Sequence, residues 1–255
     1  AFNNGGFSLF PNSLMNFSGQ YLITFTISML YIIGGTGFVV LMDIKRSKRW
    51  KGLSTNSKLI LSTIAGLNLI AFVLLWAIES NNPLTLAPMS LGDQALNAWF
   101  HATVPRSSGF NSLDLAQMKD ASTLVTMLLM FIGGGSMSTA GGIKVGTFII
   151  VLLSVISLLR REDEIRVFNH SVSQKTSFKA MAVVSITAAL IFLGIFSLSL
   201  IEPNHQFMDL LFEAISAACT VGLSRGITGE LQPASLFILM LLMFAGRLGP
   251  LTLAY

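Results

Sequence analysis

Charged residues are scarce in this sequence. Only 11% of its 255 residues are charged, whereas 53% are hydrophobic and the mean hydropathy is +0.71. These values lie outside the usual range for soluble domains and predict an integral membrane protein. The basic residues exceed the acidic ones, 16 against 12, but they lie in short segments between apolar runs. Such a distribution is typical of membrane topology signals, so we expect no nucleic acid as a partner.

Cysteine and histidine are almost absent. The single cysteine, Cys219, excludes an internal disulfide and any cysteine-based metal cluster. The three histidines, His101, His170 and His205, are dispersed without the spacing of a transition-metal site. A Gly-Leu-Ser-Arg-Gly match to the nucleophile pattern of hydrolases surrounds Ser224, but neither aspartate nor histidine follows it. We therefore expect no enzyme activity.

Five apolar runs make up most of the chain. They occupy residues 20–42, 59–78, 123–159, 180–201 and 234–255. About 20 helical residues cross a bilayer, so four runs fit one span each and the third is too long. The connections 43–58 and 160–179 hold eleven of the 16 basic residues, which places them in the cytoplasm. Three glycines of the first run, Gly34, Gly35 and Gly37, are interpreted as residues that allow close helix packing.

Two moderately apolar stretches are too short to span a membrane. They are residues 91–104 and 207–219, and both lie in connections that face outside, so we expect re-entrant helices. Each stretch leads into a glycine turn, at Gly109 and at Gly222. The first residues of the chain, around Gly6, repeat the end of this pattern. The sequence thus predicts an all-α membrane protein of repeated helix, re-entrant pore helix and helix units around a central ion pore.

Polar residues recur at one position of these turns. Asn4, Ser107 and Thr220 each lie two residues before the glycine. A helix that enters from outside directs its partly negative C-terminal end toward the bilayer centre. The glycine then allows successive backbone carbonyls to face one axis. Because the turns contain no acidic residue, the pattern favours a monovalent cation held by carbonyl oxygens.

A glycine-rich segment, GGGSMSTAGGIKVG, interrupts the third apolar run at residues 133–146. Six of its fourteen residues are glycine, and each costs about 1 kcal/mol relative to alanine inside a helix. We predict non-helical backbone at membrane depth, which requires burial in protein or a water-filled or ion-filled path. A flexible kink in one long helix is the alternative. A phosphate-binding loop is excluded, because no Gly-Lys-Ser/Thr follows and no strand precedes.

Two basic residues, Lys144 and Arg247, lie within apolar segments, where a charge is costly and usually functional. Lys144 could instead extend to the cytoplasmic interface. Arg247, beside Gly246 and Gly249, has less freedom to do so. Our hypothesis is that Arg247 holds the glycine-rich segment through its carbonyls and sets the population of a closed state.

Several segments together resemble the Trk/Ktr/HKT superfamily of potassium transporters, and most closely its bacterial Ktr membrane subunits. They are AFNNGGFSLF, TVPRSSGFNSLDL, GGSMSTAGGIKVGTF, CTVGLS and GRLGPLTLA, and they extend over nearly the whole chain. The resemblance implies four helix, pore helix and helix units around one pore. Because the first unit and most of the second are missing, we expect the chain to be a C-terminal fragment.

The resemblance also implies a division of the chain. Residues 1–43 would hold the filter turn and second helix of unit 2, 44–58 a cytoplasmic loop, 59–160 unit 3 with its intramembrane loop 133–146, 161–175 a second cytoplasmic loop, and 176–255 unit 4.

Site residues follow from the same resemblance. The filter residues would be Asn4, Gly5, Gly6, Ser107, Ser108, Gly109, Thr220, Val221 and Gly222. The gating residues would be Gly133, Gly134, Gly135, Ser136, Ser138, Thr139, Gly141, Gly142, Lys144 and Arg247. Gly5 stands where the family more often has alanine. None of the three turns has the serine in place of the filter glycine that would indicate sodium transport.

The implied function is potassium uptake across the bacterial plasma (inner) membrane by a multi-pass protein, gated by the intramembrane loop. The ion would be K⁺, with Na⁺ as a candidate coupling ion. The implied partners are membrane lipids, a second copy in a homodimer and a cytoplasmic ring of nucleotide-binding regulatory subunits. The alternatives are a secondary transporter for a small solute that uses broken helices, or a sodium-conducting member. Repeated re-entrant helices favour the first interpretation.

Overall fold

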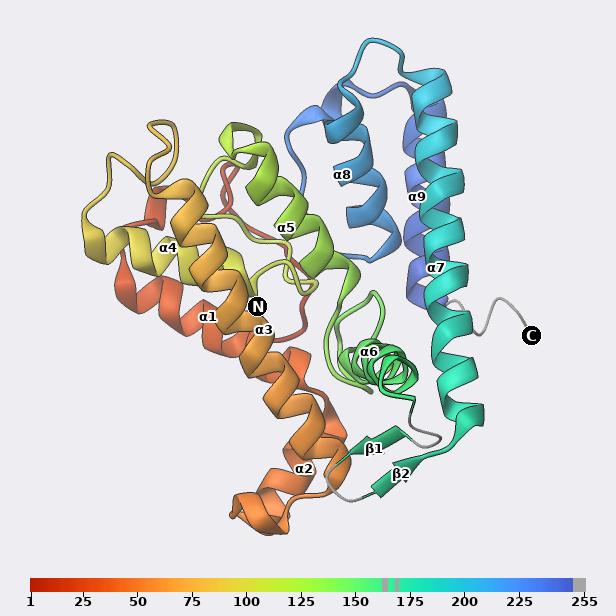
Figure 1. The fold of residues 1–255 in the computed structure, drawn as a ribbon. Coiled ribbons are helices and arrows are strands. Elements are labelled where there is room, and N and C mark those ends of the chain that lie inside the picture. Colours follow the sequence, from red (N-terminus) through yellow and green to blue (C-terminus); the bar gives the residue numbers. More distant parts are fainter. Residues whose placement is uncertain (162–164, 168–169, 250–255) are drawn as a thin grey trace.

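The computed structural model describes residues 1–161, 165–167 and 170–249, and its fold is helical (Figure 1). The helices are α1 (Tyr21–Thr36), α2 (Phe38–Ser47), α3 (Thr55–Glu79), α4 (Leu91–Thr103), α5 (Asp120–Phe131), α6 (Val145–Leu159), α7 (Gln174–Ile201), α8 (Phe207–Ala218) and α9 (Pro233–Leu248). Short 3-10 turns are η1 (Met15–Phe17), η2 (Trp50–Gly52), η3 (Leu115–Gln117) and η4 (Ile227–Glu230). An antiparallel hairpin pairs β1 (Ile165–Val167) with β2 (His170–Val172).

Among the described residues, two helices, α3 and α7, are long and apolar enough to cross a membrane, and the bent pair α1 and α2 would make a third span. Shorter apolar helices are α5, α6 and α9. Both long helices begin at a serine cap, since Ser54 accepts a hydrogen bond from the Ser57 amide and Ser173 accepts one from the Thr176 amide. The cap and the following apolar residues thus fix where each long helix begins.

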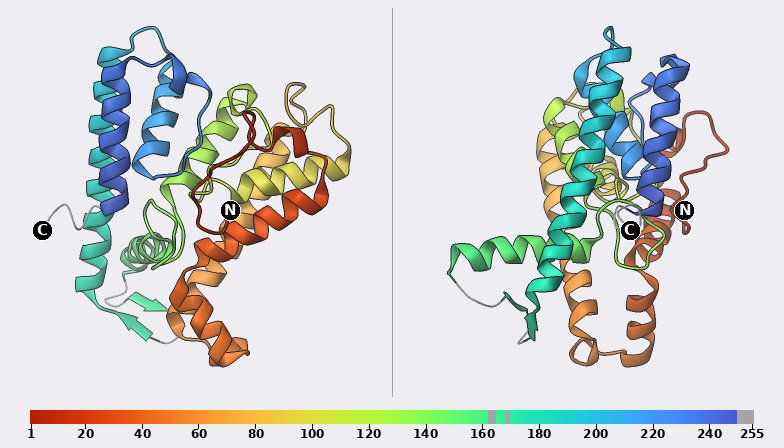
Figure 2. Two further views of the ribbon diagram at one scale, coloured as in Figure 1. Left: turned by 180° about the vertical axis from the view of Figure 1, so that it is seen from behind. Right: turned by 90° about the vertical axis from the view of Figure 1, so that its right-hand side faces the viewer.

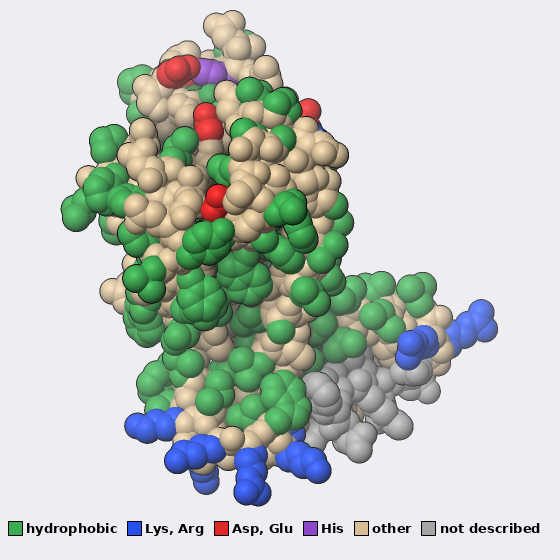
Figure 3. All heavy atoms as spheres, turned by 90° about the vertical axis from the view of Figure 1, so that its left-hand side faces the viewer, with side chains coloured by type: hydrophobic (Ala, Val, Ile, Leu, Met, Phe, Trp, Pro, Cys, Tyr) green, Lys and Arg blue, Asp and Glu red, His purple; other side chains and the backbone are tan. Residues whose placement is uncertain are grey.

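The two ends of the molecule carry side chains of opposite charge. Lysine and arginine side chains gather at the end formed by α2 and η2, and acidic side chains lie toward the other end (Figure 3). The exposed basic residues at this end are Lys45, Arg46, Lys48, Arg49 and Lys51. This is the end that the positive-inside rule places in the cytoplasm.

The short helices α4 and α8 occupy the two stretches predicted to be re-entrant. Helix α4 packs on α1 and α3, and α8 packs on α7, α9 and α5. The order long helix, short helix, helix therefore occurs twice, as α3, α4, α5 and as α7, α8, α9 (Figure 1). In the view from behind, the N-terminal segment descends between the α1 and α4 helices and the α8 and α9 helices (Figure 2).

The main apolar core joins the two sets of helices. Phe100 of α4, Met130 of α5 and Phe212 of α8 are fully buried in one cluster. Tyr31 of α1 packs edge-on against Phe100, with ring centroids 5.9 Å apart, and its hydroxyl is 2.7 Å from the Thr103 hydroxyl. The core therefore reaches the C-terminal end of α4 and positions it.

Two apolar runs depart from the simplest prediction. The run 20–42 is not one helix, because Gly37 adopts φ +102° and α1 and α2 are bent by 96°. The interpretation of Gly37 as a packing glycine alone is wrong, although a Cβ there would also lie 2.3 Å from the Ser136 carbonyl oxygen. The run 123–159 forms two helices joined by residues 132–144, so the kinked single helix is excluded. Helix α6 lies roughly across the direction of α7 (Figure 2).

Parts of two predicted segments lie outside the described residues. They are 162–164 and 168–169 in the loop 161–175, and 250–255 at the end of the segment 176–255.

Glu79 closes the connection between α3 and α5, and we predict that it is important for stability. It is 1% exposed and accepts hydrogen bonds from Asn82 Nδ2 (2.7 Å), Thr85 Oγ1 (2.5 Å) and the Lys119 amide (2.9 Å). Glu79→Ala leaves the Thr85 hydroxyl and the Lys119 amide without this acceptor, while Asn82 keeps its bond to the Gln117 carbonyl oxygen, and should lower the free energy of unfolding by roughly 3 kcal/mol. Thermal unfolding in detergent measures the loss. Glu230→Ala, at an exposed carboxylate, is the control, and equal effects of the two variants would contradict the prediction.

Candidate functional site

Three glycine turns from distant parts of the chain converge. Gly6, Gly109 and Gly222 adopt φ of +67°, +70° and +84°. A Cβ at Gly6 would lie 2.7 Å from Gly109 Cα, and a Cβ at Gly222 would lie 3.5 Å from the same atom. A side chain at Gly6 or Gly109 would therefore collide with the neighbouring turn. Glycine is required here both by the backbone conformation and by the close approach.

The turns also share a conformation two residues earlier. Asn4, Ser107 and Thr220 have φ of +50°, +66° and +50°, a left-handed conformation that is uncommon outside glycine. The sequence repeat is thus a repeat of backbone geometry. Two of the turns follow directly from the C-terminal ends of α4 and α8, where the helix dipole is negative.

Side chains of one turn bind carbonyls of the next. Asn4 Nδ2 donates to the Arg106 carbonyl oxygen at 3.5 Å, and Ser107 Oγ donates to the Thr220 carbonyl oxygen at 2.6 Å. Beyond Gly222 the chain is anchored by Arg225, whose Nε is 2.6 Å from Asp209 Oδ1 and whose Nη1 donates to Thr123 Oγ1 at 2.6 Å. The three turns therefore form one connected unit.

A cavity lies beside these turns. The cavity has a volume of about 410 Å³. Its lining includes Asn4, Gly5, Thr220, Val221 and Gly222. Its lining also includes Arg247 of α9. The structure thus places residues predicted for the filter and a residue predicted for gating along one open space.

Several backbone amides in and beside the segment 132–144 donate hydrogen bonds to carbonyl oxygens of the same part of the chain. Gly133 N donates to Ile143 O at 2.8 Å, Ile143 N to Phe131 O at 3.1 Å, and Val145 N to Gly134 O at 2.9 Å. Gly135 N donates to Gly35 O of α1 at 2.7 Å. Non-helical backbone with such internal partners is tolerated in a membrane protein when it is buried or lines a cavity. We call residues 132–144 the loop.

Gly141 of the loop contacts the glycine turns. Gly141 N donates to Ser107 Oγ at 3.1 Å. A Cβ at Gly141 would lie 1.9 Å from Thr220 Oγ1 and 2.6 Å from the Cys219 carbonyl oxygen. Glycine at 141 is therefore needed for the loop to lie directly against the turn that ends at Gly222.

Both basic residues predicted from the sequence bind loop carbonyls. Arg247 Nη1 donates to the Thr139 carbonyl oxygen at 2.9 Å, as hypothesised, although its effect on gating stays a prediction. Lys144 Nζ donates to the Ala140 carbonyl oxygen, so it does not extend away from the loop.

The other predicted loop residues form bonds to α1 or within the loop, adopt a left-handed conformation, or lie close to the bend at Gly37. Thr139 Oγ1 donates to Gly34 O at 3.4 Å, and Ser138 N donates to Gly135 O at 3.2 Å. Gly142 adopts φ +68°, and the Ser136 carbonyl lies close to Gly37.

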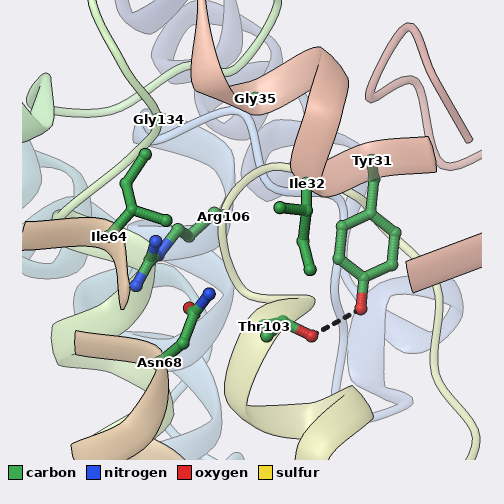
Figure 4. Close-up of a pocket in the computed structure, with 8 residues that line it drawn as sticks. All are labelled: Tyr31, Ile32, Gly35, Ile64, Asn68, Thr103, Arg106 and Gly134. Atoms are coloured by element: carbon green, nitrogen blue, oxygen red, sulfur yellow. Dashed lines mark hydrogen bonds between the residues drawn. The ribbon is translucent and has the colours of Figure 1, made fainter. Parts of the chain in front are cut away.

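Arg106 was not predicted as a site residue, although it directly precedes Ser107 of the predicted filter. It is 7% exposed, and its Nε and Nη2 have no hydrogen-bond partner among the described residues. Asn68 Oδ1 of α3 is unpartnered in the same sense. Figure 4 shows the guanidinium and the Asn68 amide facing a small cavity, which has about 20 Å³ of space for the centre of a water-sized sphere. That is room for one water molecule.

Converging glycine turns beside an intramembrane-type loop, in a chain of apolar helices, define a multi-pass membrane transport protein. The model of the TrkH family, described as cation transport protein, matches residues 1–255, and the chain belongs to this family. Its members transport cations, which agrees with the expectation that the chain is not an enzyme.

The relatives support this assignment. The chain is 43% identical over 255 residues to Ktr system potassium uptake protein B of Bacillus subtilis and 40% identical over 258 residues to the protein of that name from Vibrio alginolyticus. The matches cover 100% of this chain and 57% and 56% of the relatives, so the chain spans just over half their length. The crystal structure of the potassium transporter TrkH from Vibrio parahaemolyticus has the same fold, with a TM-score of 0.82 at 20% identity, covering 99% of this chain and 55% of that one.

We predict that Gly109→Ala disrupts the junction of the turns. The new Cβ would lie 2.8 Å from Gly6 Cα, and the alanine would also have to adopt φ +70°. Gly226→Ala is a matched control, because Gly226 has φ +96° but no atom lies within 4 Å of the place that a Cβ would occupy. The conformation alone costs about 1–2 kcal/mol, so thermal unfolding in detergent should show a clearly larger loss for Gly109→Ala. Equal losses would contradict a close junction.

Proposed function

We propose that this chain is part of a potassium-uptake protein of the bacterial plasma membrane, and that K⁺ passes through a filter of backbone carbonyls at the Gly6, Gly109 and Gly222 turns. The observation that carries the proposal is the convergence of three turns with the same left-handed geometry. The relatives are named potassium uptake proteins, and these names support K⁺ as the ion.

The chemistry of such a filter is the replacement of the ion's hydration shell by carbonyl oxygens. The negative ends of α4 and α8 point to the turns and stabilise a cation without a buried carboxylate in the turns. Hydrogen bonds between the turns, such as Ser107 Oγ to Thr220 O at 2.6 Å, hold the carbonyls at fixed positions. A fixed arrangement favours a monovalent cation of suitable size.

In this proposal the loop is the gate. Gly141 lies against Thr220 of the Gly222 turn and is bonded to Ser107 of the Gly109 turn. Arg247 and Lys144 hold the loop through the Thr139 and Ala140 carbonyls. An ion leaving the filter on the cytoplasmic side would meet the loop. Withdrawal of the loop would open the path.

The proposal extends to the assembly. The repeated order in α3, α4, α5 and in α7, α8, α9 supports residues 59–160 and 176–255 as successive pore units. Segment 1–43 would supply a turn and a helix of another unit, with 44–58 and 161–175 as cytoplasmic loops. A homodimer surrounded by membrane lipids and bound to a nucleotide-binding regulatory ring fits the relatives' description as parts of a Ktr system.

Sodium is the second candidate, either as a coupling ion or as a conducted ion. A relative that is 34% identical over 258 residues is the potassium/sodium uptake protein NtpJ of Enterococcus hirae. The glycine at all three turns nevertheless favours K⁺.

We predict that Gly222→Ser weakens the preference for K⁺. A Cβ at Gly222 meets no atom closer than 3.5 Å, so the variant should fold. The strain at φ +84° and the added hydroxyl would displace carbonyls of the filter. The test is rescue of a potassium-uptake-deficient bacterium by the complete gene, with uptake of K⁺ and Na⁺ measured together. Gly229→Ser, at a glycine with no atom within 4 Å, is the control. No rescue by the unaltered protein, or an unchanged K⁺ preference in Gly222→Ser, would contradict the filter.

We predict that Arg247→Gln raises resting K⁺ flux by about tenfold. The variant loses the charged donor to the Thr139 carbonyl, and because Arg247 is exposed to solvent, such a bond contributes about 1–1.5 kcal/mol to the closed position of the loop. Flux into proteoliposomes measures the change. Arg46→Gln, at an exposed arginine of α2, is the control. An unchanged resting flux would rule out a gating role for Arg247.

A further inference from the structure

The Ser107 hydroxyl lies where the loop and two glycine turns meet. It is 1% exposed, accepts a hydrogen bond from Gly141 N at 3.1 Å and donates its own to the Thr220 carbonyl oxygen at 2.6 Å. One hydroxyl group thus connects Gly141 of the loop with a carbonyl of the neighbouring turn. No other side chain among the described residues bonds to both the loop and a second glycine turn.

The two hydrogen bonds of Ser107 depend on each other. A hydroxyl has a single proton to donate, and a donor that is itself accepting a hydrogen bond donates more strongly. The Gly141 amide therefore strengthens the bond to the Thr220 carbonyl. When the loop withdraws, the Ser107 hydroxyl loses this amide and can rotate toward entering water.

The Thr220 carbonyl belongs to the turn that ends at Gly222. A carbonyl that accepts a strong hydrogen bond gives a cation a weaker field, because the donor hydrogen is itself partly positive. The same residue also touches the loop directly, since a Cβ at Gly141 would lie 1.9 Å from Thr220 Oγ1. This contact involves the Thr220 side chain, whereas the Ser107 hydroxyl acts on the Thr220 carbonyl itself.

We propose that Ser107 couples the gate to the filter: K⁺ binding at the Thr220 carbonyl and closure of the loop on Ser107 oppose each other. This inference rests on the proposed function, since it requires a filter at the turns and a gate at the loop. By linkage, the closed loop lowers K⁺ affinity and bound K⁺ favours withdrawal of the loop by the same factor. Ser107 is a positioning residue in this scheme.

The test is a mutant cycle with K⁺ affinity as its readout. Arg247→Gln releases the loop, and the affinity is taken from the K⁺-dependent rise of the unfolding temperature in detergent, with N-methylglucamine as the replacing cation. Arg247→Gln should raise K⁺ affinity about 2- to 10-fold in the otherwise unaltered protein, which is the effect of one hydrogen bond. In a Ser107→Ala background, Arg247→Gln should leave K⁺ affinity unchanged.

The neighbouring serine is a matched control. Ser108 is fully buried, and its hydroxyl has no hydrogen-bond partner among the described residues. Because Ser108 belongs to the proposed filter, Ser108→Ala can itself change K⁺ affinity, but Arg247→Gln should raise the affinity of this variant by the same factor as in the unaltered protein. Ser107→Thr should retain the coupling, because Thr220 shows that threonine accepts the left-handed conformation at this position of a turn. If Ser107→Ala does not fold, Ser107→Cys, a weak donor, takes its place.

The outcomes separate this inference from the proposal on which it rests. An equal rise of K⁺ affinity in the Ser107→Ala and Ser108→Ala backgrounds would overturn the coupling while leaving filter and gate in place. Absence of K⁺-dependent stabilisation in the unaltered protein would overturn the filter and the coupling together. A rise that is lost with Ser107→Ala and kept with Ser107→Thr supports the coupling.

Discussion

Backbone groups at membrane depth have to find their hydrogen-bond partners inside the protein, and this requirement organises the structure around the loop. Residues 132–144 form no helix, so their amides bond to one another, to Gly35 of α1 and to Ser107 of a glycine turn. Their carbonyls receive Arg247 and Lys144. The loop is therefore hydrogen-bonded to α1, to α9 and to a glycine turn at the same time.

The glycine turns allow three chain segments to lie close together in one place. Gly6, Gly109 and Gly222 lack the side chains that would separate the segments, and their φ angles are all positive. The polar residues two positions earlier then link the turns through Asn4 and Ser107. Close packing and hydrogen bonding together produce a rigid cluster of carbonyl-bearing turns at the ends of short helices. The proposed carbonyl filter depends on this arrangement, because it requires carbonyl oxygens at defined positions.

Much of this could be predicted from the sequence, because it depends on local composition. The lengths of the apolar runs indicated α3 and α7, short apolar stretches indicated α4 and α8, and the glycine content of residues 133–146 indicated the loop. The contact of Arg247 with a loop carbonyl was also expected.

Three features could not be predicted, because they depend on which distant segments meet. The bend at Gly37 follows from the approach of Ser136, and the role of the Ser107 hydroxyl follows from the position of Gly141. The burial of Arg106 beside Asn68 depends on how α3 packs against the turn. None of these leaves a periodic signal in the chain.

The bend at Gly37 has a mechanical consequence. Immediately after it, Phe38 N, the first amide of α2, donates to the Met137 carbonyl of the loop at 3.3 Å. Helix α2 extends from this point to the basic end of the molecule. Helix α2 is therefore bonded to the loop at its first residue, next to the bend at Gly37. The first residue of α2 and the loop are thus joined by a backbone hydrogen bond that involves none of the glycine turns.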